Sequence, residues 1–95
     1  MSAHDPLLPH RNAIDEIDAA VLRLLNERAG HARAIGELKG TGVVYRPERE
    51  AEVLRRIQSL NTGPLPGEAV ARLFREIMSE CLAVERPLTI AYLGP

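Results

Sequence analysis

The sequence predicts an all-α domain of three helices, of which the first is unusually long. Apolar residues recur at helical spacing over three stretches that begin near residues 10, 47 and 67. Glycines and prolines interrupt the chain between these stretches. The first stretch is too long for a compact chain of 95 residues to cover, so we expect a homodimer in which a second copy covers it.

The first predicted helix begins near Pro9 or His10 and ends near Lys39, where glycines follow. A helix of about 30 residues is about 45 Å long, whereas a globule of this chain length is about 30 to 35 Å across. Gly30 and Gly36 lie inside this helix and indicate close packing against another helix. Its apolar residues share one face: Ile14, Ile17, Val21, Leu24, Leu25, Ala32, Ile35 and Leu38.

Two shorter helices are predicted after a short extended link at residues 43–45. Pro47 opens the second helix, and an Asn, Thr, Gly and Pro turn at residues 61–66 ends it. The third helix runs from about Gly67 to Glu85 or Arg86, before Pro87. Residues 88–95 have the pattern of a buried strand, which an all-helical domain cannot pair, so we interpret them as the start of another domain.

Composition and charge disfavour several classes of function. The formal net charge of −1 and an aromatic content of 3% argue against a nucleic-acid partner. A single cysteine excludes a disulfide framework, and the three histidines show no metal-ligand spacing with it. No segment has the length of a membrane span, and residues 1–8 read as a flexible leader without a secretion signal. We therefore expect a cytoplasmic protein without a metal.

Charged residues interrupt the apolar faces of the predicted helices. Arg28 takes an apolar position in the seven-residue series that runs through Ile14, Val21 and Ile35. The charged residues that lean toward these faces are Arg11, Arg28, Lys39, Arg49, Glu50 and Glu85. Burying a guanidinium without an anion is unfavourable, and this set contains four cations against two anions. The pattern therefore favours a site for a dianionic ligand.

Each of these residues, taken singly, also has a structural interpretation. Arg28 can form a buried ion pair that fixes helix register, and Lys39 is a favourable charge at a helix end. Arg49 and Glu50 can be solvated in a charged first turn, and Cys81 can be a small core residue. Arg11 can be flexible near the start of the chain, and Glu85 can lie at a frayed helix end. The shared face is what favours a ligand site.

These residues, in this order, resemble the all-helical chorismate mutases, in particular the N-terminal domain of fused chorismate mutase–prephenate dehydratases. The resemblance rests on RNAIDEID with Arg11, LLNERA with Arg28, IGELK with Lys39, YRPERE with Arg49 and Glu50, and LFREIMSECLAVE ending in Glu85. It implies that residues 9–86 form the mutase domain and that residues 87–95 start a truncated dehydratase domain. It also implies an intertwined homodimer that isomerises chorismate to prephenate, without a cofactor, in phenylalanine and tyrosine biosynthesis.

The resemblance also implies roles for individual residues. Arg28, together with Arg11 from the other subunit, would bind the carboxylates of chorismate. Lys39 would donate to the ether oxygen and a carboxylate, Glu50 would accept from the ring hydroxyl, and Arg49 would complete the wall. The Claisen rearrangement needs no nucleophile, because the enzyme selects a compact conformer and stabilises the charge that builds on the ether oxygen.

Three positions depart from the pattern of some relatives. Glu85 stands where some relatives have glutamine, and only a protonated carboxyl can donate to the ether oxygen. We therefore expect Glu85 to act as a neutral donor. Cys81 replaces a hydroxyl residue and is a weaker donor to a carboxylate. Arg46 stands where some relatives have an acidic residue, so only its backbone is expected at the substrate.

Two alternatives remain at the level of the sequence. An isochorismate pyruvate lyase resembles the same family, although the dehydratase-like tail argues against it. A helical dimerisation module or regulatory remnant would keep the fold without binding substrate. By the resemblance, feedback control by phenylalanine would reside in a distal domain outside this chain.

Overall fold

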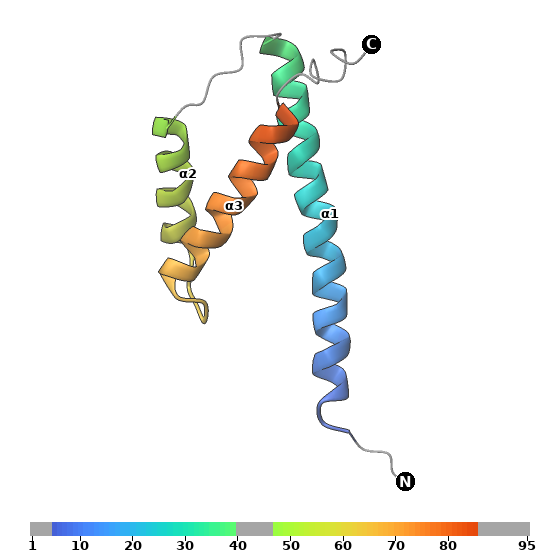
Figure 1. Cartoon of the computed structure of the whole chain (residues 1–95). Helices are drawn as coiled ribbons and strands as arrows, with labels where there is room; N and C mark the ends of the chain where they lie inside the picture. The colour runs from blue at the N-terminus through green and yellow to red at the C-terminus, as the bar shows by residue number, and fades with distance from the viewer. Residues whose placement is uncertain (1–4, 40–46, 86–95) are drawn as a thin grey trace.

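The described chain forms three α-helices joined by short connections. The structure is a computed structural model that describes residues 5–39 and 47–85. The helices are α1 (Leu8–Lys39), α2 (Pro47–Leu60) and α3 (Gly67–Glu85), as shown in Figure 1. The all-α prediction is confirmed, and α1 begins one or two residues before the expected start. The predicted link at 43–45 and the predicted strand at 88–95 lie outside the described residues.

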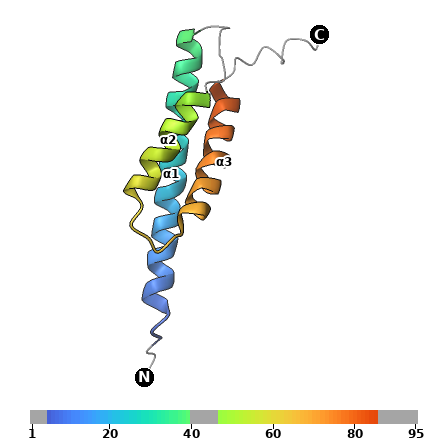
Figure 2. The ribbon, with the colours of Figure 1, turned by 90° about the vertical axis from the view of Figure 1, so that its left-hand side faces the viewer.

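α3 is the helix that holds the other two together. It packs against the C-terminal part of α1 and also along α2. Within the described ranges, α1 and α2 make no close backbone contact with each other. The N-terminal end of the 32-residue α1 extends beyond both shorter helices, as Figures 1 and 2 show from two directions.

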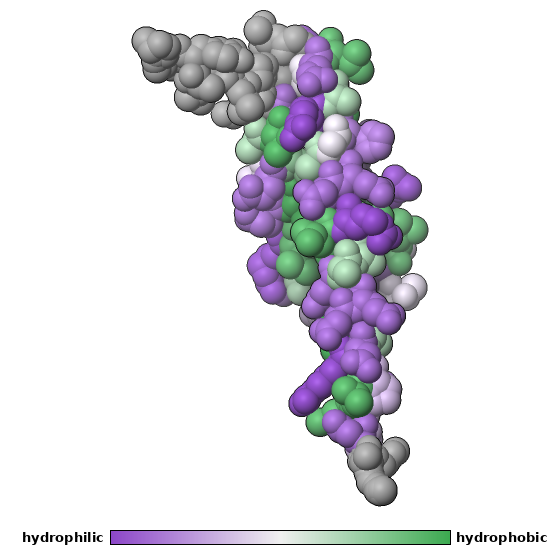
Figure 3. Space-filling model, turned by 90° about the vertical axis from the view of Figure 1, so that its right-hand side faces the viewer, coloured by the Kyte–Doolittle hydropathy of each residue, from purple (hydrophilic) through white to green (hydrophobic). Residues whose placement is uncertain are grey.

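A single chain buries few apolar side chains. The buried apolar residues among those described are Ala32, Val70, Ala71 and Cys81. The predicted apolar stripe of α1 is instead exposed over its N-terminal half, at Ile14, Ile17, Val21 and Leu24. Figure 3 shows apolar side chains at the surface among hydrophilic ones. None of the helices in the described ranges is long and apolar enough to cross a membrane.

α3 approaches α1 very closely at Gly36. Gly36 is buried, and a Cβ atom there would collide with the backbone carbonyl oxygen of Glu85 and lie 2.8 Å from its carbonyl carbon. The predicted close packing is therefore found at Gly36. It is not found at Gly30 within the described chain, where a Cβ atom would meet no atom within 4 Å.

The turn between α2 and α3 is organised by Asn61 and Gly63. The Asn61 side chain accepts a hydrogen bond from the Gly63 amide at 2.9 Å and donates one to the Leu65 carbonyl, also at 2.9 Å. Gly63 has a φ of 84°, a left-handed conformation that glycine adopts without steric cost. This geometry explains why Asn and Gly occupy the turn that the sequence predicts.

Candidate active site

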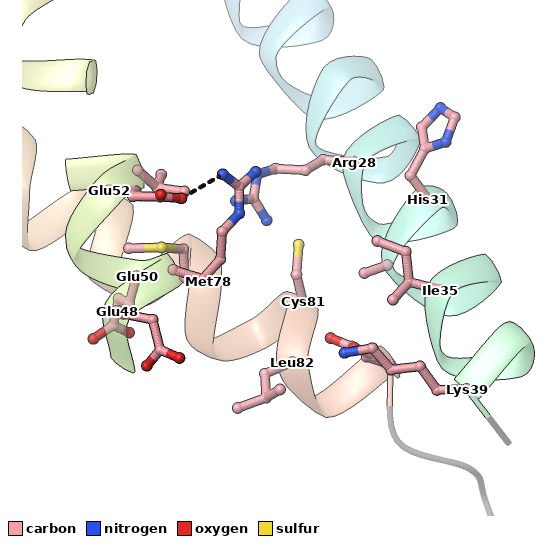
Figure 4. A pocket seen from close by; sticks show the side chains of 14 residues that line it. Arg28, His31, Ile35, Lys39, Glu48, Glu50, Glu52, Met78, Cys81 and Leu82 are labelled. Atoms are coloured by element: carbon pink, nitrogen blue, oxygen red, sulfur yellow. Dashed lines mark hydrogen bonds and ion pairs between the residues drawn. The ribbon is translucent and has the colours of Figure 1, made fainter. Parts of the chain in front are cut away.

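A cavity of about 550 Å³ lies between the C-terminal part of α1, the start of α2 and the end of α3 (Figure 4). Its volume is in the range of pockets that bind small molecules. The lining residues are Arg28, His31, Ala32, Ile35, Lys39, Glu48, Arg49, Glu50, Glu52, Val53, Met78, Cys81, Leu82 and Glu85.

Arg28 is a half-buried cation that extends from α1 into this cavity. Arg28, Ala32, Ile35 and Lys39 are spaced by three or four residues, so they share one face of α1. Figure 4 shows the Arg28 side chain reaching across the pocket toward the side of α2 that carries Glu52. Among the residues that the structure describes, Arg28 has no hydrogen bond or ion pair. The buried ion pair that was an alternative for Arg28 is therefore not formed within this part of the chain.

Lys39 and Glu85 join the ends of α1 and α3 at one end of the pocket. The Lys39 Nζ atom lies 3.5 Å from a carboxylate oxygen of Glu85. The Glu85 side chain is 14% exposed and that of Lys39 is 37% exposed. An ion pair of this kind requires an ionised carboxylate, so the neutral form of Glu85 expected during the reaction stays a prediction.

α2 contributes charged side chains from its first two turns. Arg49 donates a hydrogen bond to Glu52 at 3.2 Å, the contact drawn as a dashed line to Glu52 in Figure 4. Both side chains are mostly exposed. Glu48 and Glu50 lie in the first turn of α2, where an anion interacts favourably with the helix dipole.

Cys81 lies on the α3 side of the pocket. Its side chain is buried, and Figure 4 shows its sulfur atom directed toward the region between α3 and Arg28. Met78 and Leu82 are half-buried beside it and give this wall an apolar surface. The thiol is thus both a core group, as one interpretation of the sequence predicted, and a part of the pocket lining.

The comparisons with known proteins agree with this arrangement of helices. Residues 10–86 match the model of the family described as chorismate mutase type II. The chain belongs to this family. The resemblance stated from the sequence is therefore confirmed.

Curated relatives of this chain are longer proteins. Over 89 residues the chain is 84% identical to the bifunctional chorismate mutase/prephenate dehydratase of Neisseria gonorrhoeae, and this match covers 94% of the chain and 25% of the relative. It is 53% identical to the protein of the same description from Pseudomonas aeruginosa, with 100% of the chain and 28% of the relative covered. The chain thus spans about a quarter of the length of the relatives it matches.

Solved structures of chorismate mutases have the same fold. The Form II structure of chorismate mutase from Thermus thermophilus matches with a TM-score of 0.80 and 35% identity, over 85% of this chain and 94% of that one. The Form I structure from the same organism matches with a TM-score of 0.76 and 34% identity, over 81% of this chain and 99% of that one.

Most of the site residues predicted for this chain meet in one pocket. Those that line it are Arg28, Lys39, Arg49, Glu50, Cys81 and Glu85. Arg46 lies outside the described residues. Arg11 does not line the pocket: it precedes Arg28 by 17 residues on the same helix, which corresponds to about 26 Å.

The charge balance of the pocket differs from the balance expected from the sequence. Sequence reasoning missed Glu48 and Glu52, although each lies one turn or less from Arg49. With them, the described lining holds three cations, Arg28, Lys39 and Arg49, against four carboxylates. Among the described lining residues the expected surplus of positive charge is not found, because Arg11 is remote and two further glutamates are present.

Proposed function

We propose that this chain catalyses the rearrangement of chorismate to prephenate, as an isomerase on the route to phenylalanine and tyrosine. The observation that carries the proposal is Arg28, a half-buried cation with no partner in the described chain, inside a pocket of ligand size. Partial burial of a guanidinium is costly unless an anion meets it. Chorismate, with two carboxylates, supplies such an anion.

The pocket offers the two forms of catalysis that this pericyclic reaction uses. Apolar side chains on three helices, among them Ile35, Val53 and Leu82, favour a compact substrate conformer with its reacting carbons close together. Lys39 and Glu85 lie at one end, where they would stabilise the negative charge that develops on the ether oxygen. In this scheme Arg28 binds a carboxylate of chorismate, and Glu50 accepts a hydrogen bond from the ring hydroxyl. Arg49 completes the wall of the pocket.

A second copy of the chain is part of the proposal. A dianionic substrate is bound more tightly when a further cation lies near it. Arg11 is too far along α1 to supply that charge to its own pocket. The exposed apolar stripe on the N-terminal half of α1 gives a second chain a surface to cover. We infer an intertwined homodimer in which Arg11 acts at the pocket of the partner subunit.

The first test is to incubate the purified chain with chorismate and to follow its conversion to prephenate. We expect turnover without an added cofactor. A folded, dimeric chain that leaves chorismate unchanged would instead favour the dimerisation or regulatory module. Incubation with isochorismate, with pyruvate measured, serves as the control for the lyase alternative.

A mixing experiment tests the contribution of Arg11 across the interface. Arg11→Ala and Arg28→Ala chains are each expected to be inactive as homodimers. When they are unfolded and refolded together, half of the dimers are mixed, and one site in each mixed dimer carries both arginines. About a quarter of the wild-type rate should therefore return. If mixing restores nothing, although mixed dimers are detected by mass spectrometry, Arg11 does not act across the interface.

Further parts of the sequence-based interpretation remain predictions. We retain residues 9–86 as the mutase domain and residues 87–95 as the start of a prephenate dehydratase domain. Of the leader predicted at residues 1–8, Leu8 already belongs to α1. The bifunctional names of the longer curated relatives support this division. A cytoplasmic location is likewise retained as a prediction.

A further inference from the structure

Gly36 lies beside the pocket without lining it. It is between Ala32 and Lys39 on α1, both of which do line the cavity. Gly36 is buried against the end of α3, at the backbone of Glu85. Gly36 contributes no side chain to the site or to the contact. Its effect is therefore steric: the absence of a Cβ atom leaves room for a neighbour.

The last residue of α3 meets α1 at two points. The backbone of Glu85 occupies the space where a Cβ atom of Gly36 would be, so its carbonyl oxygen, carbonyl carbon and Cα atom all lie within contact distance of that position. Its side chain pairs with Lys39 at 3.5 Å, three residues farther along α1. The depth at which Glu85 rests on Gly36 consequently sets how far its carboxyl group lies from Lys39.

We propose that Gly36 is a positioning residue for the reaction, because its missing side chain lets the end of α3 approach α1 and brings the Glu85 carboxyl beside Lys39. The inference rests on the proposed chorismate mutase function. A methyl group at this position meets backbone atoms, which cannot rotate away as a side chain can. The end of α3 must then move outward by a distance on the order of 1 Å, and a displacement of that size can lower a rate about 100-fold.

The test compares Gly36→Ala with Gly30→Ala. Both variants replace a glycine inside α1 by alanine and gain the same helix propensity, but only the first creates a collision. We expect Gly36→Ala to lower kcat/KM about 100-fold, mainly through kcat, with unchanged helicity and oligomeric state. Gly30→Ala should keep wild-type activity. Wild-type activity in Gly36→Ala would overturn the proposal.

A double-mutant cycle separates positioning of Glu85 from a general disturbance of the pocket. If Gly36 acts through Glu85, then adding Gly36→Ala to Glu85→Ala should change kcat/KM less than about 2-fold. A similar 100-fold loss in both backgrounds would show that Gly36 acts on the whole pocket, and would overturn the proposal.

A spectroscopic measurement keeps the inference separate from the proposed function. In the wild-type chain, Lys39→Met should shift the NMR signal of the Glu85 carboxyl carbon, because the ion pair is removed. In the Gly36→Ala background the same change should leave that signal almost unmoved. A chain without mutase activity overturns the proposed function, whereas equal NMR shifts in both backgrounds overturn the placement of Glu85 by Gly36.

Folding of the variant is tested in the same series. If Gly36→Ala alone does not fold, the measurements are made on Gly30→Ala/Gly36→Ala in sucrose, which favours compact states. Failure to fold under those conditions counts against the proposal, because Gly36 would then be a requirement of the fold rather than of the position of Glu85.

Discussion

At the scale of single residues, helical spacing predicts which side chains meet, but not how they are paired. Arg28, Lys39, Cys81 and Glu85 were predicted to face inward, and all four line the pocket. The pairing of Lys39 with Glu85 depends on where α3 ends against α1. Sequence periodicity within one helix carries no information about the distance between Lys39 on α1 and Glu85 on α3.

Arg28→Ala should remove most of kcat/KM, by about 1,000-fold or more, while the protein stays folded and is as stable as the wild type or more so. The physical reason is that an unpaired, half-buried cation contributes to ligand binding and not to an internal ion pair. Kinetics with chorismate measure the loss of activity, and thermal unfolding measures the stability. Arg33→Ala, an exposed position on α1 outside the pocket, is the matched control. Unfolding of Arg28→Ala would mean that the arginine has a structural partner.

Glu85→Gln tests the neutral donor. A carboxyl donates to the ether oxygen only when it is protonated, whereas the amide of glutamine always carries a donor. We expect Glu85→Gln to keep at least the wild-type kcat/KM, and Glu85→Ala, which has no donor, to lower it about 100-fold. The measurement is kcat/KM of the three proteins with chorismate. A Glu85→Gln variant as slow as Glu85→Ala contradicts the donor role of this side chain.

At the scale of helices and turns, local signals predicted the architecture well. Pro47 opens α2 and Gly67 begins α3, as the sequence indicated. The orientation of α2 was harder to predict, because it packs on α3 and has no close backbone contact with α1 in the described ranges. Glu48 and Glu52 were missed as lining residues for this reason.

Gly63→Ala should destabilise the domain by about 1 to 2 kcal/mol. Gly63 has a φ of 84°, where an L-residue with a Cβ atom is strained. The turn is remote from the pocket lining, so kcat/KM of the folded protein should remain within about 2-fold of wild type. Chemical denaturation gives the free energy of unfolding. Gly67→Ala is the control, since a Cβ atom there meets only the Gln58 side chain at 3.9 Å.

At the scale of the whole molecule, the length of α1 predicted that one chain cannot cover the whole apolar face of this helix. The 32-residue helix carries its pocket residues on its C-terminal half and an exposed apolar stripe on its N-terminal half. The sequence predicted this stripe as a buried face, and in the single chain it is exposed. The proposed partner chain would cover this stripe.

Ile17→Glu should convert the proposed dimer to monomers or to unfolded chains. Ile17 is 57% exposed in the single chain, and the proposed interface would bury the introduced charge without a partner. Activity should fall together with dimerisation as the protein concentration is lowered. Analytical ultracentrifugation of Ile17→Glu and of Glu16→Gln, an exposed neighbour, measures the association. A stable, active Ile17→Glu dimer would show that the interface does not include Ile17.

The distance of about 26 Å between Arg11 and Arg28 along α1 also has a genetic consequence. If each site takes one arginine from each chain, an allele with both Arg11→Ala and Arg28→Ala damages its own pocket and that of a wild-type partner. Both sites of every mixed dimer are then inactive, so at equal expression about a quarter of the activity remains, in dimers of two wild-type chains. Either single allele leaves one working site in each mixed dimer, so about half of the activity remains.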